Sequence, residues 1–249
     1  MARFRRFGWI ALTIAFTLVL QFVVERAANV PPRMAEAQTL PSLADIVALV
    51  PSGATAVRLD EFVLDGTPYA SLSYSDAAFP PNQMFTVYSW DGQSWSPAFD
   101  LSRTAAGICQ SALQDFVAQV TCAWSVTDLH TLIKFPSEQS SMPDLIAVTL
   151  GFSFPPGNSY FSVLVLIGNN SRGMTAFQTV KFSARGGIDS VFRLSANAVF
   201  IEADAYGSGD PFCCPGSFEY VVLSWVGDGF VESARCVRDR RAFSSSPCV

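Results

Sequence analysis

Short runs of alternating apolar and polar residues, separated by glycine and proline, follow one another from about residue 55 to the end of the chain. This period of two is typical of antiparallel strands with one buried face. Leu43–Val50 fits a short helix or strand, and Ala112–Ala118 is the one later stretch where a short helix fits. The pattern predicts an all-β domain with strands at Val57–Leu59, Phe62–Leu64, Tyr69–Tyr74, Met84–Trp90, Val117–Trp124, His130–Phe135, Leu145–Phe152, Tyr160–Ile167, Ala176–Phe182, Val191–Leu194, Ala198–Ala203, Phe218–Trp225 and Phe230–Cys236.

Three stretches repeat the same order of features: a strand, a loop with prolines, a second strand, a glycine turn and a third strand. The first two strands and the turn of each copy lie at Tyr69–Tyr74 with Phe85–Gly92, Leu145–Leu150 with Phe161–Gly168, and Val199–Asp204 with Phe218–Gly227. Repeated units of this kind are typical of propeller blades or stacked meanders. We expect antiparallel meander repeats in a small or incomplete β-propeller, with a β-sandwich as the alternative. The 21 phenylalanines would fill the core.

The chain begins with a basic and then apolar segment. Three arginines, at positions 3, 5 and 6, precede an apolar run at residues 7–24. The run is long enough for one membrane span, and its positive flank favours an amino terminus in the cytoplasm. We therefore expect a hydrophobic helix at 1–24 that anchors the chain in the membrane, a linker at 25–41 and an extracytoplasmic domain at 42–249. The alternative is a secreted protein, cleaved after Ala37 in a small-x-small sequence.

The charge balance limits the partners of this domain. The formal net charge is −5, and five of the 16 basic residues precede residue 37. Proteins that bind nucleic acid need a basic face to replace phosphate counterions, so no nucleic-acid partner is expected. Beyond the amino-terminal segment, arginines cluster only near the carboxyl end. This cluster suggests a solvated face, or alternatively a contact with anionic head groups; it consists of Arg235, Arg238, Arg240 and Arg241.

All six cysteines lie beyond residue 100, at Cys109, Cys122, Cys213, Cys214, Cys236 and Cys248. An even number in a chain with an export segment favours disulfides. The best candidate pair is Cys109 with Cys122, on two apolar runs that fit the arms of one hairpin, and the other four are expected to pair among themselves. A redox-active Cys213–Cys214 pair is the alternative. A reactive thiol needs nearby cations, whereas Asp210 and Glu219 are the charged neighbours here.

Candidate catalytic residues are few. His130 is the only histidine and follows Asp128, which suits a general base, but its alternation with apolar residues favours a strand position. Glu202, Asp204 and Asp210 surround the paired cysteines; two carboxylates on one face suit glycoside hydrolysis or a cation, and Asp210 before a proline suits a turn cap. Zinc-ligand spacing and a Gly-x-Ser-x-Gly elbow are both missing from the sequence. We expect no catalytic residue, metal or cofactor.

The stretch Asp210-Pro-x-Cys213-Cys214-Pro215, followed by a strand and Trp-x-Gly, resembles the LppP/LprE-type envelope lipoprotein family. The resemblance covers about the last fifty residues and implies a secreted or membrane-tethered bacterial envelope protein of undefined activity. A lipidation cysteine is missing near the amino terminus, so the anchoring mode of that family does not carry over. More loosely, the repeats look like propellers of the VCBS/FG-GAP kind, whose calcium loops are dense in aspartate. The corresponding stretch, Asp60–Gly66, lacks that ligand spacing.

These observations predict a non-enzymatic β-domain, membrane-tethered or secreted, that acts as an interaction or scaffold module of the cell envelope. The loops at 75–83 and 206–216 are the candidate contact surfaces for an envelope protein or polymer, with Asp204, Tyr206 and Asp210 as a possible binding loop. One alternative is a thiol–disulfide or redox-sensing protein that uses Cys213 and Cys214. A further alternative is a hydrolase that uses Glu202, Asp204 or Asp210.

Overall fold

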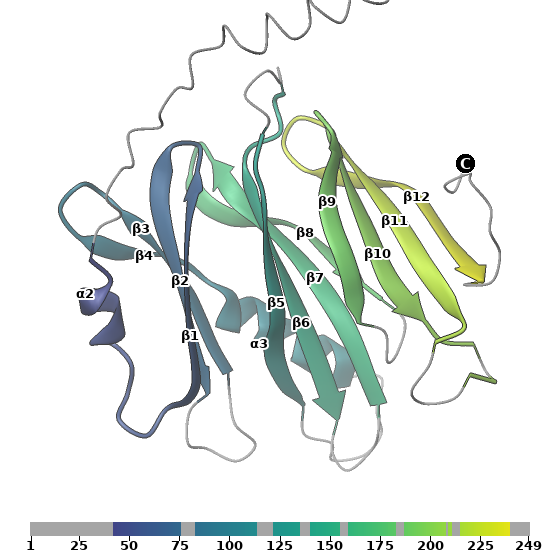
Figure 1. Cartoon of the computed structure of the whole chain (residues 1–249), viewed down its shortest axis with the longest axis horizontal. Coiled ribbons are helices and arrows are strands. Elements are labelled where there is room, and N and C mark those ends of the chain that lie inside the picture. The colour runs from purple at the N-terminus through teal and green to yellow at the C-terminus, as the bar shows by residue number, and fades with distance from the viewer. Residues whose placement is uncertain are drawn as a thin grey trace, which may run out of the picture. The chain divides into compact units, whose positions relative to one another are not determined.

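The computed structural model describes residues 42–75, 83–113, 122–134, 140–154, 159–182, 187–207, 209–210 and 215–239. The helix expected at 1–24 and the linker at 25–41 lie outside these ranges. Within them, the chain forms three four-stranded antiparallel sheets and two helices (Figure 1), which confirms the all-β prediction. Neither helix is long and apolar enough to cross a membrane.

Each sheet is a meander whose strands pair in the order in which they occur along the chain. The first sheet contains β1 (Thr55–Leu64), β2 (Thr67–Ser75), β3 (Gln83–Trp90) and β4 (Trp95–Asp100). The second contains β5 (Ala123–Leu132), β6 (Leu145–Phe154), β7 (Ser159–Asn170) and β8 (Gly173–Lys181). The third contains β9 (Ile188–Ser195), β10 (Ala198–Ala205), β11 (Ser217–Trp225) and β12 (Phe230–Asp239).

The three sequence repeats correspond to the three sheets, and the first two strands of each copy are the two inner strands of one sheet. Two details differ from the prediction. The third strand of the first copy, β4, contains Pro97 and was not among the expected strands; β4 is an edge strand, where the missing N–H of proline is tolerated. In the second copy the turn comes later than Gly168, at Gly173, which has φ +109°. Gly168 lies inside β7, where the close neighbours require glycine: a Cβ there would come within 2.7 Å of Leu145 and 2.8 Å of the Asp144 carbonyl oxygen.

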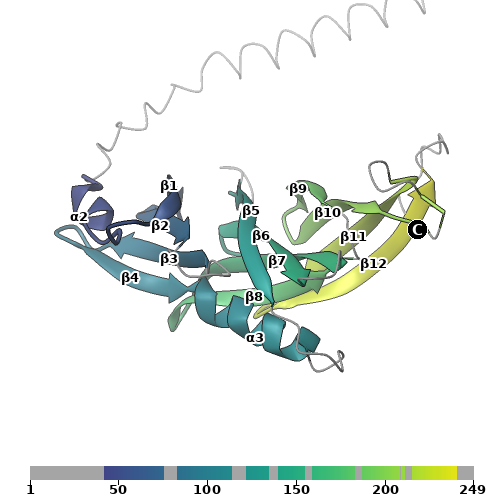
Figure 2. The same cartoon turned by 90° about the horizontal axis from the view of Figure 1, so that it is seen from below.

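The second sheet lies between the other two and is buried on both faces (Figure 1 and Figure 2). Along β6, Ile146 and Val148 pack in a core shared with the first sheet, which we call the first interface. Leu145 and Ala147 face the other way, into a core shared with the third sheet, which we call the second interface. Burial on both faces explains why β6 is a continuous apolar run rather than an alternating one.

The connection between the first and second sheets contains a helix that begins earlier than the sequence pattern predicts. A short helix was expected at 112–118, of which 114–118 lie outside the described ranges, and α3 spans Leu101–Leu113. Its residues Leu101, Ala105 and Cys109 are buried in the first interface, and this spacing of four gives a helix one apolar face. At its start, Asp100 Oδ1 accepts a hydrogen bond from the Ser102 backbone N–H at 2.9 Å, the usual N-cap arrangement.

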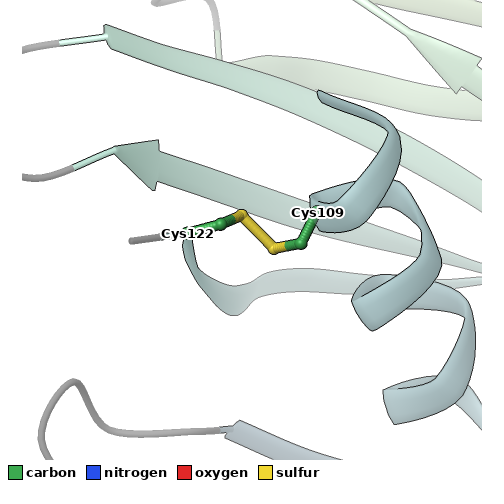
Figure 3. Close-up of a disulfide and its surroundings, with 2 residues drawn as sticks. All are labelled: Cys109 and Cys122. Carbon is green, nitrogen blue, oxygen red and sulfur yellow. A yellow bond between two sulfur atoms is a disulfide. The ribbon is translucent and has the colours of Figure 1, made fainter. Parts of the chain in front are cut away.

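The Cys109–Cys122 disulfide ties α3 to the residue before β5, with the two Cα atoms 5.7 Å apart (Figure 3). The favoured pairing is therefore confirmed, but the expected hairpin is not, since Cys109 lies on a helix. Cys236 is also disulfide-bonded. Cys213, Cys214 and Cys248 lie outside the described ranges.

The other face of the first sheet is covered by the short helix α2 (Ala44–Val47). Ile46 is fully buried there against Ala70, Leu72 and Tyr88. The Trp95 indole N–H donates to the Ser42 carbonyl oxygen at 2.9 Å and fixes the start of this segment. The short element expected at 43–50 is thus a helix with a packing role.

Candidate binding pocket between the second and third sheets

A pocket of about 530 Å³ lies where the turns of the second sheet meet those of the third. The β7–β8 turn, Asn169–Arg172, contributes its polar side chains, and the β11–β12 turn contributes Gly227 and Asp228. Ser141 and Pro143, shortly before β6, also line the pocket, as do the aromatic residues Phe177 and Trp225. Its volume is in the range of pockets that hold small molecules.

Local hydrogen bonds fix the two turns that form the rim. Asn170 Oδ1 accepts from the Arg172 backbone N–H at 2.7 Å, and Gly173 follows with a positive φ that favours glycine. In the other turn, the Val226 N–H donates to the Gly229 carbonyl oxygen at 2.9 Å. The rim therefore has a defined shape before any ligand binds, which lowers the entropic cost of binding.

Arg193 of β9 holds the segment that contains Ser141 and Pro143. Its Nη2 donates to Ser140 Oγ at 2.9 Å and to the Met142 carbonyl oxygen at 3.3 Å, and Nη1 donates to the Pro143 carbonyl oxygen at 3.4 Å. A guanidinium with several donors in a fixed plane suits this clamping of carbonyl groups. Sequence reasoning did not identify Arg193, because its partners lie some fifty residues away along the chain.

Trp225 is the most deeply buried aromatic residue of the pocket lining, with 9% of its surface exposed. It makes edge-on ring contacts with Phe177 and Phe230, both at 5.1 Å between centroids. Its indole Nε1 is buried and donates no hydrogen bond to any described residue. A buried donor without a partner costs free energy, so the ring contacts with Phe177 and Phe230 hold this indole in place.

The rim carries one positive and one negative side chain, Arg172 and Asp228, both exposed. Neither forms an ion pair with another described residue. The two charges therefore face the pocket mouth without neutralising each other through a direct contact, and both remain available to a ligand.

The proposed binding-loop residues lie elsewhere and do not line this pocket. Asp210 accepts hydrogen bonds from the backbone N–H groups of Gly207 and Gly216 at 2.7 and 2.9 Å, and these bonds lower the pKa of its carboxyl group. It therefore closes its own loop as a turn cap. Asp204 sits near the end of β10, where its N–H donates to the Gly187 carbonyl oxygen at 2.8 Å, and Tyr206 follows that strand.

The suggested hydrolase acids Glu202 and Asp204 alternate along β10 with the buried residues Ile201 and Ala203, so both point to the outward face of the third sheet. His130 lies on a different sheet, in the edge strand β5. Its Nε2 is 3.1 Å from Asp128 Oδ2, but the pair is not aligned as a hydrogen bond. Among the residues that the structure describes, no three His, Cys, Asp or Glu side chains form a metal-binding group.

The arginine cluster does not form one basic face. Arg235 donates to Glu232 through two bonds of 2.8 Å, pairs with the buried Glu219 and lies over the Phe182 ring. The bonds to Glu232 raise the pKa of Arg235 and lower that of Glu232. Arg238, three residues further along β12, points to the opposite face, while Arg240 and Arg241 are outside the described part of the chain. Arg235 thus has a structural role.

No protein-family model matches this chain, and no curated protein or solved structure is detectably similar to it.

Proposed function

We propose that this chain is a non-enzymatic binding module of the cell envelope, membrane-tethered or secreted, built as an incomplete propeller of three blades. Four-stranded meanders that stack through their faces are the construction of propeller blades, and closed propellers have about four to eight of them. The apolar run at residues 7–24 and the resemblance around Asp210–Pro215 support an extracytoplasmic location.

The observation that carries this proposal is the chemistry of the pocket lining. The walls are fixed by Arg193 and by the two turns, and they present amide, hydroxyl, guanidinium and carboxylate groups. Covalent catalysis needs a nucleophile next to a base. Among the described residues of the lining there is no histidine, cysteine or lysine, and Asp228 is the only carboxylate. This set of groups favours holding a ligand over transforming it.

A ligand screen with a blocked variant tests the proposal. The purified full-length protein would be heated in the presence of defined sugars, amino acids, nucleotides and small anions. A ligand at about 100 times its Kd raises the free energy of unfolding by about 2.7 kcal/mol, so we expect at least one class to raise the melting temperature. Ser141→Phe, which adds a ring at the exposed pocket wall, should abolish that rise.

The matched control is Ser111→Phe, at an exposed position of α3 away from the pocket. The control should respond to the ligand as the unsubstituted protein does, and mass spectrometry should recover the ligand unchanged. Conversion of the ligand by the protein, or an equal response in Ser141→Phe, would contradict the proposal.

A further inference from the structure

We propose that the pocket binds a neutral carbohydrate of one or two sugar units; this inference rests on the proposed function and names its ligand class. A sugar hydroxyl both donates and accepts, so it needs partners of both kinds close together. The pocket supplies them: Arg172 only donates, Asp228 only accepts, and the side chains of Asn170, Ser141 and Ser171 can do both.

The charges of the rim favour an uncharged ligand. One guanidinium and one carboxylate leave the lining without a net charge. A phosphate or other anion would be attracted by Arg172 but repelled by Asp228. A cation would be attracted by Asp228 but repelled by Arg172. Vicinal hydroxyls can use both groups at once, because charged side chains make the stronger hydrogen bonds.

The aromatic wall fits the same class. A sugar ring has apolar C–H faces that can pack against the Trp225 and Phe177 side chains that line the pocket. The volume of about 530 Å³ corresponds to roughly 18 water molecules at about 30 Å³ each, which leaves room for one or two sugar rings.

Titration of the full-length protein with defined sugars tests this inference. The panel contains neutral mono- and disaccharides, with alanine as a zwitterion and inorganic phosphate as an anion for comparison. We expect one or more of the sugars to bind and to shift the indole Nε1–H resonance of Trp225 in a nitrogen–proton spectrum. Trp225→Phe assigns that resonance by removing it. Binding should change little with salt concentration, because the ligand is uncharged.

Two substitutions at the rim sharpen the test. Arg172→Ala and Asp228→Asn each remove a charged hydrogen-bonding partner, and each should weaken sugar binding about tenfold or more. Both side chains are exposed and make no side-chain bond to a described residue, so the fold should persist. The controls are Arg103→Ala, whose side chain is 91% exposed, and Asp45→Asn on α2, and both should bind sugar normally.

The outcomes separate the two proposals. Binding of alanine or phosphate in the pocket, lost in Ser141→Phe, with no sugar bound, would overturn the carbohydrate assignment and leave the binding module intact. Sugar binding that Arg172→Ala and Asp228→Asn leave unchanged would also overturn the assignment to this pocket. No binding of any class would overturn both.

Discussion

The first and second interfaces are built from the same kind of apolar core, but they end differently at the turns. At the first interface, Asp144 accepts hydrogen bonds from the backbone N–H groups of Asp65 and Lys134, at 2.9 and 2.8 Å. The Lys134 ammonium in turn bonds Asp65 at 2.9 Å. Asn169 Nδ2 also donates to the Tyr69 hydroxyl at 2.6 Å. These bonds join the first two sheets directly at that end.

At the second interface the corresponding connection is indirect. Arg193 of β9 bonds the segment before β6 instead of a strand or turn of the second sheet. The β7–β8 and β11–β12 turns stay apart and line the pocket. At the first interface, polar bonds therefore join the two sheets directly. At the second interface, the bonds reach only the segment before β6, and a pocket lies between the turns.

The segment Ser140–Asp144 takes part in both arrangements. Its last residue, Asp144, bonds across the first interface, while Ser140 and Pro143 are held by Arg193 at the second interface. A short stretch of chain therefore positions the second sheet against both neighbours and sets one wall of the pocket.

Replacing one equally buried phenylalanine in each core by alanine should have the largest effect on stability. Phe85 is buried in the first interface and Phe182 in the second, each with 1% of its surface exposed. Phe85→Ala and Phe182→Ala should each reduce the free energy of unfolding by about 3–5 kcal/mol, measured by urea denaturation. A loss below about 1 kcal/mol in only one of them would show that the two cores are not packed equally tightly.

Removing the disulfide should have the next largest effect and should act on the first interface alone. Cys109→Ala with Cys122→Ala opens a link between residues 13 positions apart. We expect a loss of about 2–4 kcal/mol, seen as a lower melting temperature. The pocket should keep its ligand affinity below that temperature. Reduced affinity without unfolding would mean that α3 influences the second interface as well.

The smallest effect should come from acidification of the loop that Asp210 caps. Its pKa lies below the ordinary value of 3.8, because the ionised form accepts the Gly207 and Gly216 N–H bonds. The stabilisation is therefore complete above pH 4 or so and is lost as the pH falls through the lowered pKa. The protection factor of the Gly216 amide against hydrogen exchange should fall over that range. Asp210→Asn should remove this pH dependence, and its persistence there would assign it to another group.

Much of the fold was predictable from the sequence, because the repeat and the period of two reflect local burial on each sheet. The start of α3 at Leu101 was not predicted, because its buried face uses small residues such as Ala105 and Cys109, which carry a weak apolar signal. The sequence pattern predicts two strands, Val117–Trp124 and His130–Phe135, where the structure has the single strand β5. The pattern breaks there because Ser125 and Thr127, inside β5, are polar. The edge strand β4 was missed because Pro97 argues against a strand in an inner position.

The pocket could not be predicted in the same way. Asn169–Ser171 lies just after the second copy of the repeat and fits only a glycosylation acceptor pattern, and Trp225 stands out only as a residue before a glycine turn. What makes them a site is their proximity to Ser141 and Asp228, which depends on how two sheets pack and on the hydrogen bonds of Arg193. Conversely, Asp204, Tyr206 and Asp210 were conspicuous in sequence because they surround the paired cysteines, yet Asp210 acts within its own loop.

Three separate meanders leave six strand edges, at β1, β4, β5, β8, β9 and β12. In the first two sheets every charged strand residue lies on an edge strand; these residues are Arg58, Asp60, Glu61, Asp100, Asp128 and Lys181. Charges and prolines on an edge discourage a second chain from adding its own strand. The first two sheets are thereby protected against aggregation through their open edges, while their inner strands carry only uncharged residues.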